Sequence, residues 1–249
     1  MDLGIAGRRA AVAAGSAGLG LATAEALVAE GVHVAICGRD AERLAAAVEA
    51  LGAHAVGIVA DLSQPEDAAR FAVDAADRLG GPLDIVVGNA GGPPPGAPST
   101  TTLDGYRTAL ELNFLSTVAL VNAAVPQMRT AGWGRVLAIT SIGARQPIVD
   151  LAASTAARAA VTAFIKNLAS EVAGDGVTAN TIQPGTHDTA RMAQLGGDHL
   201  DGLRRSIPAG RLGSASDFGS VAAFLCSEQA NYVCGASLIV DGGASKGLQ

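Results

Sequence analysis

Short apolar runs alternate with amphipathic patterns along the whole chain. The first run, residues 10–14, ends in a loop of small residues, and apolar side chains then recur at helical spacing up to Glu30. Gly31 interrupts that pattern, and residues 32–37 form a second apolar run. A strand, a loop, a helix and a strand in this order are typical of the first half of a nucleotide-binding sheet.

The same alternation continues to the end of the chain, with no internal repeat and no sign of a second domain. Asp40 is placed to cap a helix that Gly52 ends, and Pro65 falls in the first turn of the next helix. The pattern predicts an α/β fold, a single Rossmann-type doubly wound sheet of seven parallel strands with helices on both faces, over residues 1–249. The predicted strands are residues 10–14, 32–37, 54–59, 83–87, 136–140, 178–182 and 237–240. The predicted helices are residues 21–30, 40–50, 65–79, 103–113, 115–129, 151–172 and 216–227, and a polar segment of about 186–211 is expected to be irregular and to shape the substrate pocket.

The loop after the first apolar run is rich in glycine. We expect Gly15 to permit a sharp turn, and Gly18 and Gly20 to let a diphosphate and the sheet approach the backbone. A glycine loop by itself is a weak signal, because glycine also closes ordinary turns. Between a buried strand and an amphipathic helix it favours a nucleotide site, formed here by Gly15, Ser16, Ala17, Gly18, Leu19 and Gly20.

Composition narrows the class of protein. The chain of 249 residues is 49% hydrophobic and has a formal net charge of −6, which argues against a nucleic-acid surface. The apolar runs have the length of strands, so no membrane span is expected. The three cysteines are odd in number and lack CxxC spacing, which favours reduced thiols and a cytoplasmic location. No metal site is predicted.

The ordered motifs resemble the short-chain dehydrogenase/reductase family over essentially the whole chain. The glycine loop, Asp61-Leu62, the Asn89-Ala90-Gly91 triplet, Asn113, Ser141 and the Pro184-Gly185 pair followed by Thr189 carry the resemblance, together with the run from Gly235 to Gly243. The resemblance implies a dinucleotide at the carboxyl ends of the strands, a small-molecule substrate and a homotetramer. It assigns to the cofactor Asp61, Leu62, Asn89, Ala90, Gly91, Arg158, Pro184, Gly185, Thr186 and Thr189.

The chain departs from this family at the active site. The family uses Asn, Ser, Tyr and Lys, the last two in a Tyr-x-x-x-Lys turn. Alignment on the small residues that follow puts Ser154 at the tyrosine and Arg158 at the lysine, and Ser141 precedes position 154 by the family's spacing. The resemblance therefore implies a catalytic set of Asn113, Ser141, Ser154 and Arg158, without the usual acid/base pair.

This change alters the chemistry that is available. A serine hydroxyl is a poor proton source beside a phenol, and a guanidinium stays protonated, so Arg158 cannot shuttle a proton. Helical spacing puts Ser154 and Arg158 on one face of their helix. His187 could replace the lost acid, although an exposed loop histidine is the simpler interpretation.

Three of the candidates also have structural interpretations. Ser141 could only satisfy backbone groups at a strand end, and Asn113 could serve the helix rather than the chemistry. Arg158 could be a solvated surface charge, but its helix face otherwise reads as apolar. We therefore favour a cleft-lining role for Ser141 and Arg158 and leave both roles open for Asn113.

The end of the second predicted strand bears on the choice of cofactor. An acidic side chain there would bond a free ribose 2′-hydroxyl, whereas Gly38 occupies that place and Arg39 follows. A guanidinium suits a phosphate, so NADP(H) is preferred over NAD(H). Asp40 argues the other way, but as a helix cap it would point away.

Two classes of function fit these residues. The first is an NADP(H)-dependent oxidoreductase that acts on a carbonyl or alcohol through a rebuilt proton path, by way of Ser141, Ser154, a water molecule or His187. The second is a non-redox protein with the same cleft, such as a cofactor-binding scaffold, a lyase, an isomerase or a regulatory subunit. The family resemblance favours the first, and the missing Tyr and Lys favour the second.

Overall fold

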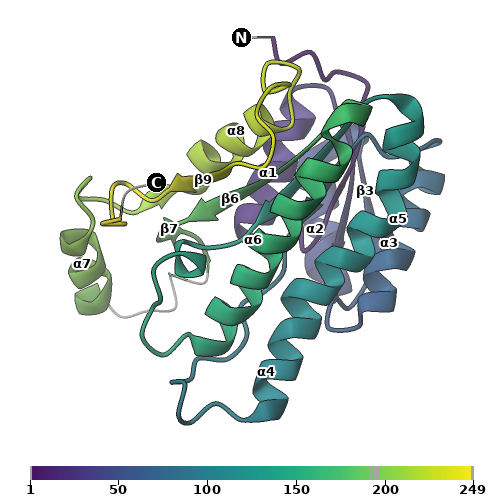
Figure 1. Cartoon of the computed structure of the whole chain (residues 1–249). Coiled ribbons are helices and arrows are strands. Elements are labelled where there is room, and N and C mark those ends of the chain that lie inside the picture. Colours follow the sequence, from purple (N-terminus) through teal and green to yellow (C-terminus); the bar gives the residue numbers. More distant parts are fainter. Residues whose placement is uncertain (1, 191, 193–196, 248–249) are drawn as a thin grey trace.

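One parallel sheet forms the centre of the molecule. The computed structural model describes residues 2–190, 192 and 197–247 (Figure 1). The seven strands of the sheet are ordered β3-β2-β1-β4-β5-β6-β9, which confirms the predicted doubly wound fold. Their bounds are Arg9–Val12 (β1), His33–Gly38 (β2), Ala55–Val59 (β3), Ile85–Gly88 (β4), Gly134–Ile139 (β5), Val177–Pro184 (β6) and Ser237–Val240 (β9).

The strands are apolar because helices cover both faces of the sheet. Along β1, Ala11 points to one hydrophobic cluster and its neighbour Val12 to the other, and both side chains are fully buried. Alternate residues of β5 behave in the same way, with Val136 on one face and Leu137 on the other. Burial on both faces explains the near-continuous apolar runs of the sequence.

The helices divide between the two faces, and α5 and α6 cross in front of the sheet in Figure 1. Residues of α1, α2 and α8 pack on one face, and residues of α3, α5 and α6 pack on the other. Their bounds are Gly18–Ala29 (α1), Ala41–Leu51 (α2), Pro65–Arg78 (α3), Leu103–Ala109 (α4), Ser116–Ala131 (α5), Ala152–Val172 (α6) and Ala215–Leu225 (α8).

Local signals set the ends of α2 as the sequence predicts. The Asp40 side chain accepts a hydrogen bond from the backbone N–H of Arg43 at 3.0 Å, which caps the helix. Gly52 follows the last turn with φ = +79°, a conformation that an L side chain rarely adopts. The carboxylate of Asp40 is thereby engaged at the helix end.

The two helices predicted for residues 103–113 and 115–129 are one continuous helical run. A π-helical turn at Leu110–Leu115 joins α4 to α5 instead of a break. The run, Leu103–Ala131, is long and apolar enough to cross a membrane by length and composition alone, with a mean hydropathy of 1.4 in its most apolar window. The premise that all apolar runs have strand length is therefore wrong. In this structure α5 packs against α3 and the sheet.

The polar segment of about residues 186–211 is more ordered than predicted. His187–Asp188 (β7) pairs in parallel with Gly213–Ser214 (β8), and Gly197–Ser206 forms α7, at the left edge of Figure 1. Residues 191 and 193–196 of the predicted segment lie outside the described residues. The sequence does not indicate this helix because its ten residues are mostly polar and include two glycines, which are unfavourable inside a helix.

The strand order fixes where a site can form. Strand β1 pairs with β2 on one side and with β4 on the other, so the direction of winding reverses between β1 and β4. In open parallel sheets, ligands bind beyond the carboxyl ends of the strands at such a reversal. The loops that follow β1, β4, β5 and β6 all start at this end of the sheet.

Candidate active site and cofactor cleft

The three glycines of the loop after β1 have separate tasks. A Cβ at Gly20 would collide with the Ala14 carbonyl oxygen, and one at Gly15 would lie 2.7 Å from Ile36. The backbone turns at Ala14 and Gly18, with φ of +46° and +58°. Gly15 lies in the turn at residues 13–16, as expected, although its own φ is not positive. A Cβ there would also lie 3.0 Å from the Val12 carbonyl oxygen, so its small size lets the loop both turn and pack against β2.

The start of α1 is open to an anion. No side chain caps this helix, and its first turn holds no acidic residue. Among the described residues, a Cβ at Gly18 would meet Thr189 alone, at 3.9 Å, which places the segment after β6 next to the loop. Unpaired N–H groups at a helix start and a glycine surface fit the diphosphate of a dinucleotide.

Asn89 ties the end of β4 to the glycine loop. Its Nδ2 lies 3.3 Å from the carbonyl oxygens of both Ala13 and Ala14. Ala90 beside it is buried, and a Cβ at Gly91 would meet none of the described residues within 4 Å. The triplet thus packs its first residue against the glycine loop and leaves its last residue exposed.

The ends of β2 and β3 carry the residues that the sequence predicts to face an adenine ribose. A Cβ at Gly38 would lie 2.6 Å from Ser16 Oγ, so the end of β2 touches the glycine loop there. Arg39 is exposed next to this contact. At the end of β3, the Asp61 carboxylate accepts a hydrogen bond from the Ser63 backbone N–H at 3.0 Å, and Leu62 is buried.

Ser154 and Arg158 meet on one face of α6, as their spacing predicts. Arg158 Nε donates to Ser154 Oγ at 3.3 Å. Arg158 Nη1 donates to the carbonyl oxygens of Ile139 at 3.1 Å and Thr140 at 2.9 Å, and Nη2 lies 3.4 Å from the Ala90 carbonyl oxygen. The guanidinium therefore spans the ends of β4 and β5, and the interpretation as a solvated surface charge is wrong.

The other two candidates sit close to this position. Ser141 directly follows Thr140, and its Oγ accepts a hydrogen bond from the Gly143 backbone N–H at 2.9 Å. Asn113 lies in the π-helical turn and is 3% exposed; its Nδ2 reaches the Ala109 carbonyl oxygen, and its Oδ1 has no partner among the described residues. Both residues make structural bonds, and Asn113 keeps an unused buried acceptor. Short π-helical turns occur frequently at functional sites.

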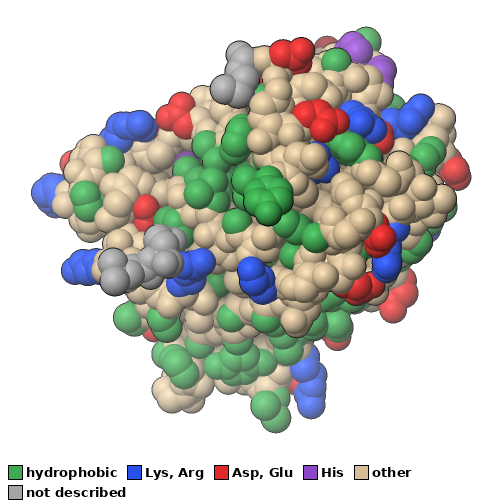
Figure 2. Space-filling model, turned by 45° about the horizontal axis from the view of Figure 1, so that its top comes forward, with side chains coloured by type: hydrophobic (Ala, Val, Ile, Leu, Met, Phe, Trp, Pro, Cys, Tyr) green, Lys and Arg blue, Asp and Glu red, His purple; other side chains and the backbone are tan. Residues whose placement is uncertain are grey.

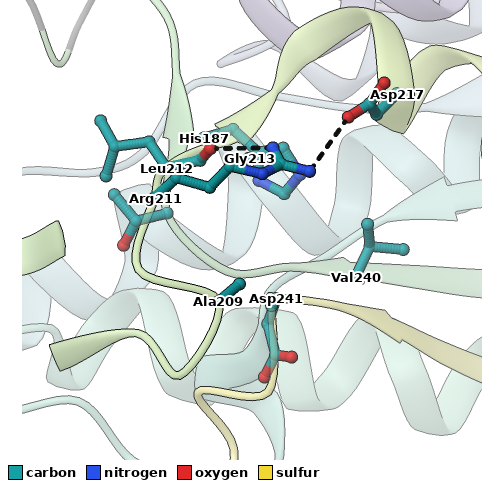
Figure 3. A pocket seen from close by; sticks show the side chains of 10 residues that line it. His187, Ala209, Arg211, Leu212, Gly213, Asp217, Val240 and Asp241 are labelled. Atoms are coloured by element: carbon teal, nitrogen blue, oxygen red, sulfur yellow. Dashed lines mark hydrogen bonds and ion pairs between the residues drawn. The ribbon is translucent and has the colours of Figure 1, made fainter. Parts of the chain in front are cut away.

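The interpretation of His187 as an exposed loop histidine is wrong. The side chain is 5% exposed, and its ring packs edge-on against Phe218 with centroids 5.2 Å apart. Its Nδ1 lies 3.2 Å from the Gly185 carbonyl oxygen. Figure 3 shows Arg211 reaching over this ring toward Asp217, with 3.7 Å between Arg211 Nη2 and Asp217 Oδ2. His187, Arg211 and Asp217 line a small cavity of about 110 Å³.

Burial makes His187 a source of pH-dependent stability. Desolvation lowers the pKa of His187 below its ordinary 6.5, and the Gly185 carbonyl and the two nearby aspartates oppose this shift only in part. Below about pH 6.5 the unfolded chain binds a proton that the folded chain excludes, so the free energy of unfolding falls as the pH falls.

We expect His187→Phe, which keeps a ring against Phe218, to flatten this dependence. Urea unfolding of both proteins at about pH 7.5 and about pH 5.5 measures it. An equal loss of stability in the two proteins between these conditions would show that His187 is not the group that titrates.

Sequence reasoning missed two polar residues at this end of the sheet. Thr140 directly follows β5 and Gln183 lies near the end of β6, and the two side chains are 3% and 0% exposed. The available signal was a polar residue at the end of an otherwise apolar strand. A polar residue at a strand end does not by itself mark a site, because polar side chains ordinarily begin where a buried strand ends.

Comparison with known proteins places this geometry in a family. Residues 13–245 match the family described as enoyl-(acyl carrier protein) reductase. The chain is 32% identical to dehydrogenase/reductase SDR family member 4 of Sus scrofa, over 96% of this chain and 88% of that protein. It is 32% identical to the 3-oxoacyl-[acyl-carrier-protein] reductase of Salmonella typhimurium, over 95% and 97%. L-sorbose reductase from Gluconobacter frateurii, solved with NADPH and L-sorbose, superposes with a TM-score of 0.93 at 31% identity, covering 100% of both chains.

Proposed function

Because this chain belongs to the short-chain dehydrogenase/reductase family of oxidoreductases, we propose that it binds NADP(H) and acts on a carbonyl or alcohol through an atypical site. The observation that carries the proposal is the Arg158 to Ser154 hydrogen bond at the end of β5, next to Ser141. It puts a hydroxyl and a fixed positive charge where the cleft is lined by the glycine loop and the β4 end.

The described residues fit a dinucleotide. Backbone N–H groups at the start of α1 would hold the diphosphate, and Arg39 would face the ribose 2′-phosphate. Thr189 next to Gly18 would cover the cofactor from the side of β6. When bound, the nicotinamide supplies or accepts the hydride, and this chain supplies the orientation and the proton.

Ser154 takes the place of the acid in this proposal. Its Oγ accepts a hydrogen bond from Arg158, so its own proton is free to point at a substrate oxygen. The guanidinium stabilises negative charge that develops on that oxygen, but it stays protonated and delivers no proton. Turnover should therefore be slow beside a site with a phenolic acid.

One observation favours a second function. The Arg158 donors already engage three backbone carbonyls at the ends of β4 and β5, which is the work of a structural clamp. A non-redox protein that binds the cofactor would need no more than this. A screen of NADPH oxidation against ketones and quinones, beside an NADPH titration, separates the two: binding without turnover over the whole panel supports the second function.

The relatives support a small-molecule carbonyl compound as the substrate. The similar L-sorbose reductase was solved with L-sorbose bound, and an L-fucose dehydrogenase of Oryctolagus cuniculus is 36% identical over 97% of this chain and 86% of that protein. Other relatives reduce acyl-carrier-bound ketones, as the name of the Salmonella protein states. The panel should accordingly hold both sugars and acyl ketones.

We expect Arg39→Ala to remove most of the preference for NADPH. Arg39 is exposed at the end of β2, where Gly38 leaves no acid to repel a phosphate. Charge-assisted bonds to phosphate are about twice as strong as neutral ones, so NADPH affinity should fall while NADH affinity changes little. Fluorescence titration of both cofactors measures this. Equal affinities in the natural protein would contradict the NADP(H) assignment.

We also expect a homotetramer. Leu103 and Leu115, on the run that contains α4 and α5, are 74% and 40% exposed, and Tyr232 and Leu238 are exposed beside the edge strand β9. Hydrophobic side chains gather at the centre of the face in Figure 2 and along its lower margin. Apolar surface of this kind commonly meets a partner. A monomer in light scattering at micromolar concentration would contradict this expectation.

A further inference from the structure

Two neighbouring strands end in buried polar side chains that have no partner. Thr140 Oγ1, Gln183 Oε1 and Gln183 Nε2 are enclosed, and none makes a hydrogen bond among the described residues. A buried amide without partners is costly, and such groups in native proteins are ordinarily bonded to protein or to ordered water. These three atoms therefore indicate a binding site inside the protein.

The strand register puts the two side chains together. Ile139 of β5 pairs with Ile182 of β6, and the Thr140 N–H donates to the Ile182 carbonyl oxygen at 2.9 Å, so Thr140 and Gln183 are the next pair along the ladder. Side chains alternate between faces along a strand. Ala138 and Ala179 belong to the cluster on the α6 face, so Thr140 and Gln183, two and four residues further on, lie on that face too.

Arg158 lies directly over this position. Its Nη1 donates to the carbonyl oxygen of Thr140 at 2.9 Å, so the same residue that carries an orphan hydroxyl also anchors the guanidinium. Arg158 in turn holds Ser154. A movement of Thr140 is transmitted through these two hydrogen bonds to the candidate proton donor.

We propose that Thr140 and Gln183 bind one internal water molecule beneath Arg158, and that they are positioning residues for Ser154. A buried water needs two to four polar partners, and this pair offers three atoms that include both donors and acceptors. The water bridges the ends of β5 and β6 and thereby holds the Thr140 carbonyl oxygen in position to accept the hydrogen bond from Arg158. The effect on turnover rests on the proposed function, whereas the water site itself does not.

The chain offers a matched control. Thr178 is also buried, at 4% exposure, with an unpartnered Oγ1, but it lies at the opposite end of β6. Thr178 and Ile182 are four residues apart on β6, so their side chains lie on the same face, and Ile182 belongs to the cluster on the face opposite α6. Thr140→Val and Thr178→Val therefore make the same chemical change, and only the first removes a partner of the proposed water.

Crystal structures of the natural protein and of both variants test the site without any need for turnover. We expect a water within hydrogen-bonding distance of Thr140 Oγ1 and the Gln183 amide, lost with a shift of Arg158 in Thr140→Val and kept in Thr178→Val. A direct bond between Gln183 and Thr140, with no water between them, would overturn the proposal. So would an Arg158 that does not move when the water is lost.

Kinetics test the positioning role. In Thr140→Val, kcat for an active ketone should fall by ~10–100-fold with little change in KM, because a small misplacement of a reacting group has an effect of this size. Thr140→Ser should restore the rate, and Thr178→Val should not change it. A Thr140→Val protein with a lowered melting temperature but an unchanged kcat would refute the role. If the natural protein reduces nothing, the proposed function fails, and the crystallographic outcome still decides the water site.

Discussion

The double change Ser154→Tyr with Arg158→Lys is expected to raise NADPH-dependent reduction of activated ketones by ~10²–10⁴-fold, the usual contribution of a well-placed general acid. A phenol reaches further than a serine hydroxyl and is far more acidic. Lysine at position 158 would lower the phenol pKa and bond the ribose, where Arg158 now holds the carbonyls of β4 and β5. Steady-state oxidation of NADPH, followed by absorbance, measures the gain.

The two single changes are the controls for this experiment. Each should give less than the double change, because Tyr needs the lysine to tune its pKa and Lys has no proton to deliver without Tyr. Suppose that the natural protein reduces these ketones at ordinary rates and the double variant is no faster. Another residue then supplies the proton, and the role assigned to Ser154 is wrong.

The second large effect concerns a buried arginine at the opposite end of the sheet. Arg135 is fully buried, with Nε 3.0 Å from the Ser227 carbonyl oxygen and Nη2 3.1 Å from Asn231 Oδ1. Its guanidinium lies 4.2 Å from the ring centre of Trp133, and Glu228 is its acidic neighbour at 3.8 Å. Burial lowers the pKa of Arg135 from its ordinary value, and the nearby Glu228 carboxylate opposes this shift. Each polar group here depends on the others for its partners.

We expect Arg135→Ala to lower the free energy of unfolding by about 3–5 kcal/mol, because it leaves a cavity and several buried acceptors unpaired. At ~2–4 °C per kcal/mol for a chain of this size, calorimetry should show a large fall in melting temperature. The matched control is Arg129→Ala. Arg129 is 41% exposed and pairs with Glu171 and Asp175 at the surface, which is worth about 0–1 kcal/mol.

The comparison of the two arginines is the decisive part. Equal losses of stability for Arg135→Ala and Arg129→Ala would mean that burial and the Trp133 contact add nothing to the Arg135 network. The double change of Arg135→Met with Glu228→Gln provides a further check. It removes both charges and fills part of the cavity, so it should recover some of the stability that Arg135→Ala loses.

The sequence predicts the frame of this fold well, because the frame depends on local patterns. Strands buried on both faces must be apolar throughout, and Ala11 and Val12 illustrate why neither face is polar. Asp40 and Gly52 act within a few residues of the helix that they delimit. Such short-range signals carry over directly from sequence to structure.

Features set by distant contacts could not be predicted in this way. His187 is buried because Phe218 and Gly213, which follow it by some 30 residues, pack on its ring; a Cβ at Gly213 would lie 2.5 Å from it. The π-helical turn at Leu110–Leu115 joins two segments that the sequence pattern separates. Helix α7 is mostly polar and contains two glycines, so its pattern does not stand out from the polar segment around it.

In the candidate site too, contacts set by local spacing could be predicted, and contacts between distant parts of the chain could not. The spacing of four residues puts Ser154 and Arg158 on one helical face, and their hydrogen bond confirms it. The acceptors of Arg158 at Ala90 and Ile139 come from two other strands, and no local pattern predicts them. The pairing of Thr140 with Gln183 likewise follows only from the register of β5 and β6.

A single titration and turnover experiment on the unmutated protein tests whether it binds NADPH and reduces ketones slowly for want of a phenolic acid. NADPH is added to the purified protein, its bound fluorescence is followed to saturation, and ketones from both classes of relative are then supplied. We expect one NADPH bound per chain and slow oxidation of the bound NADPH that depends on a ketone. Absence of NADPH binding would contradict the assignment of the cleft to a cofactor, and rapid oxidation would contradict the loss of the general acid.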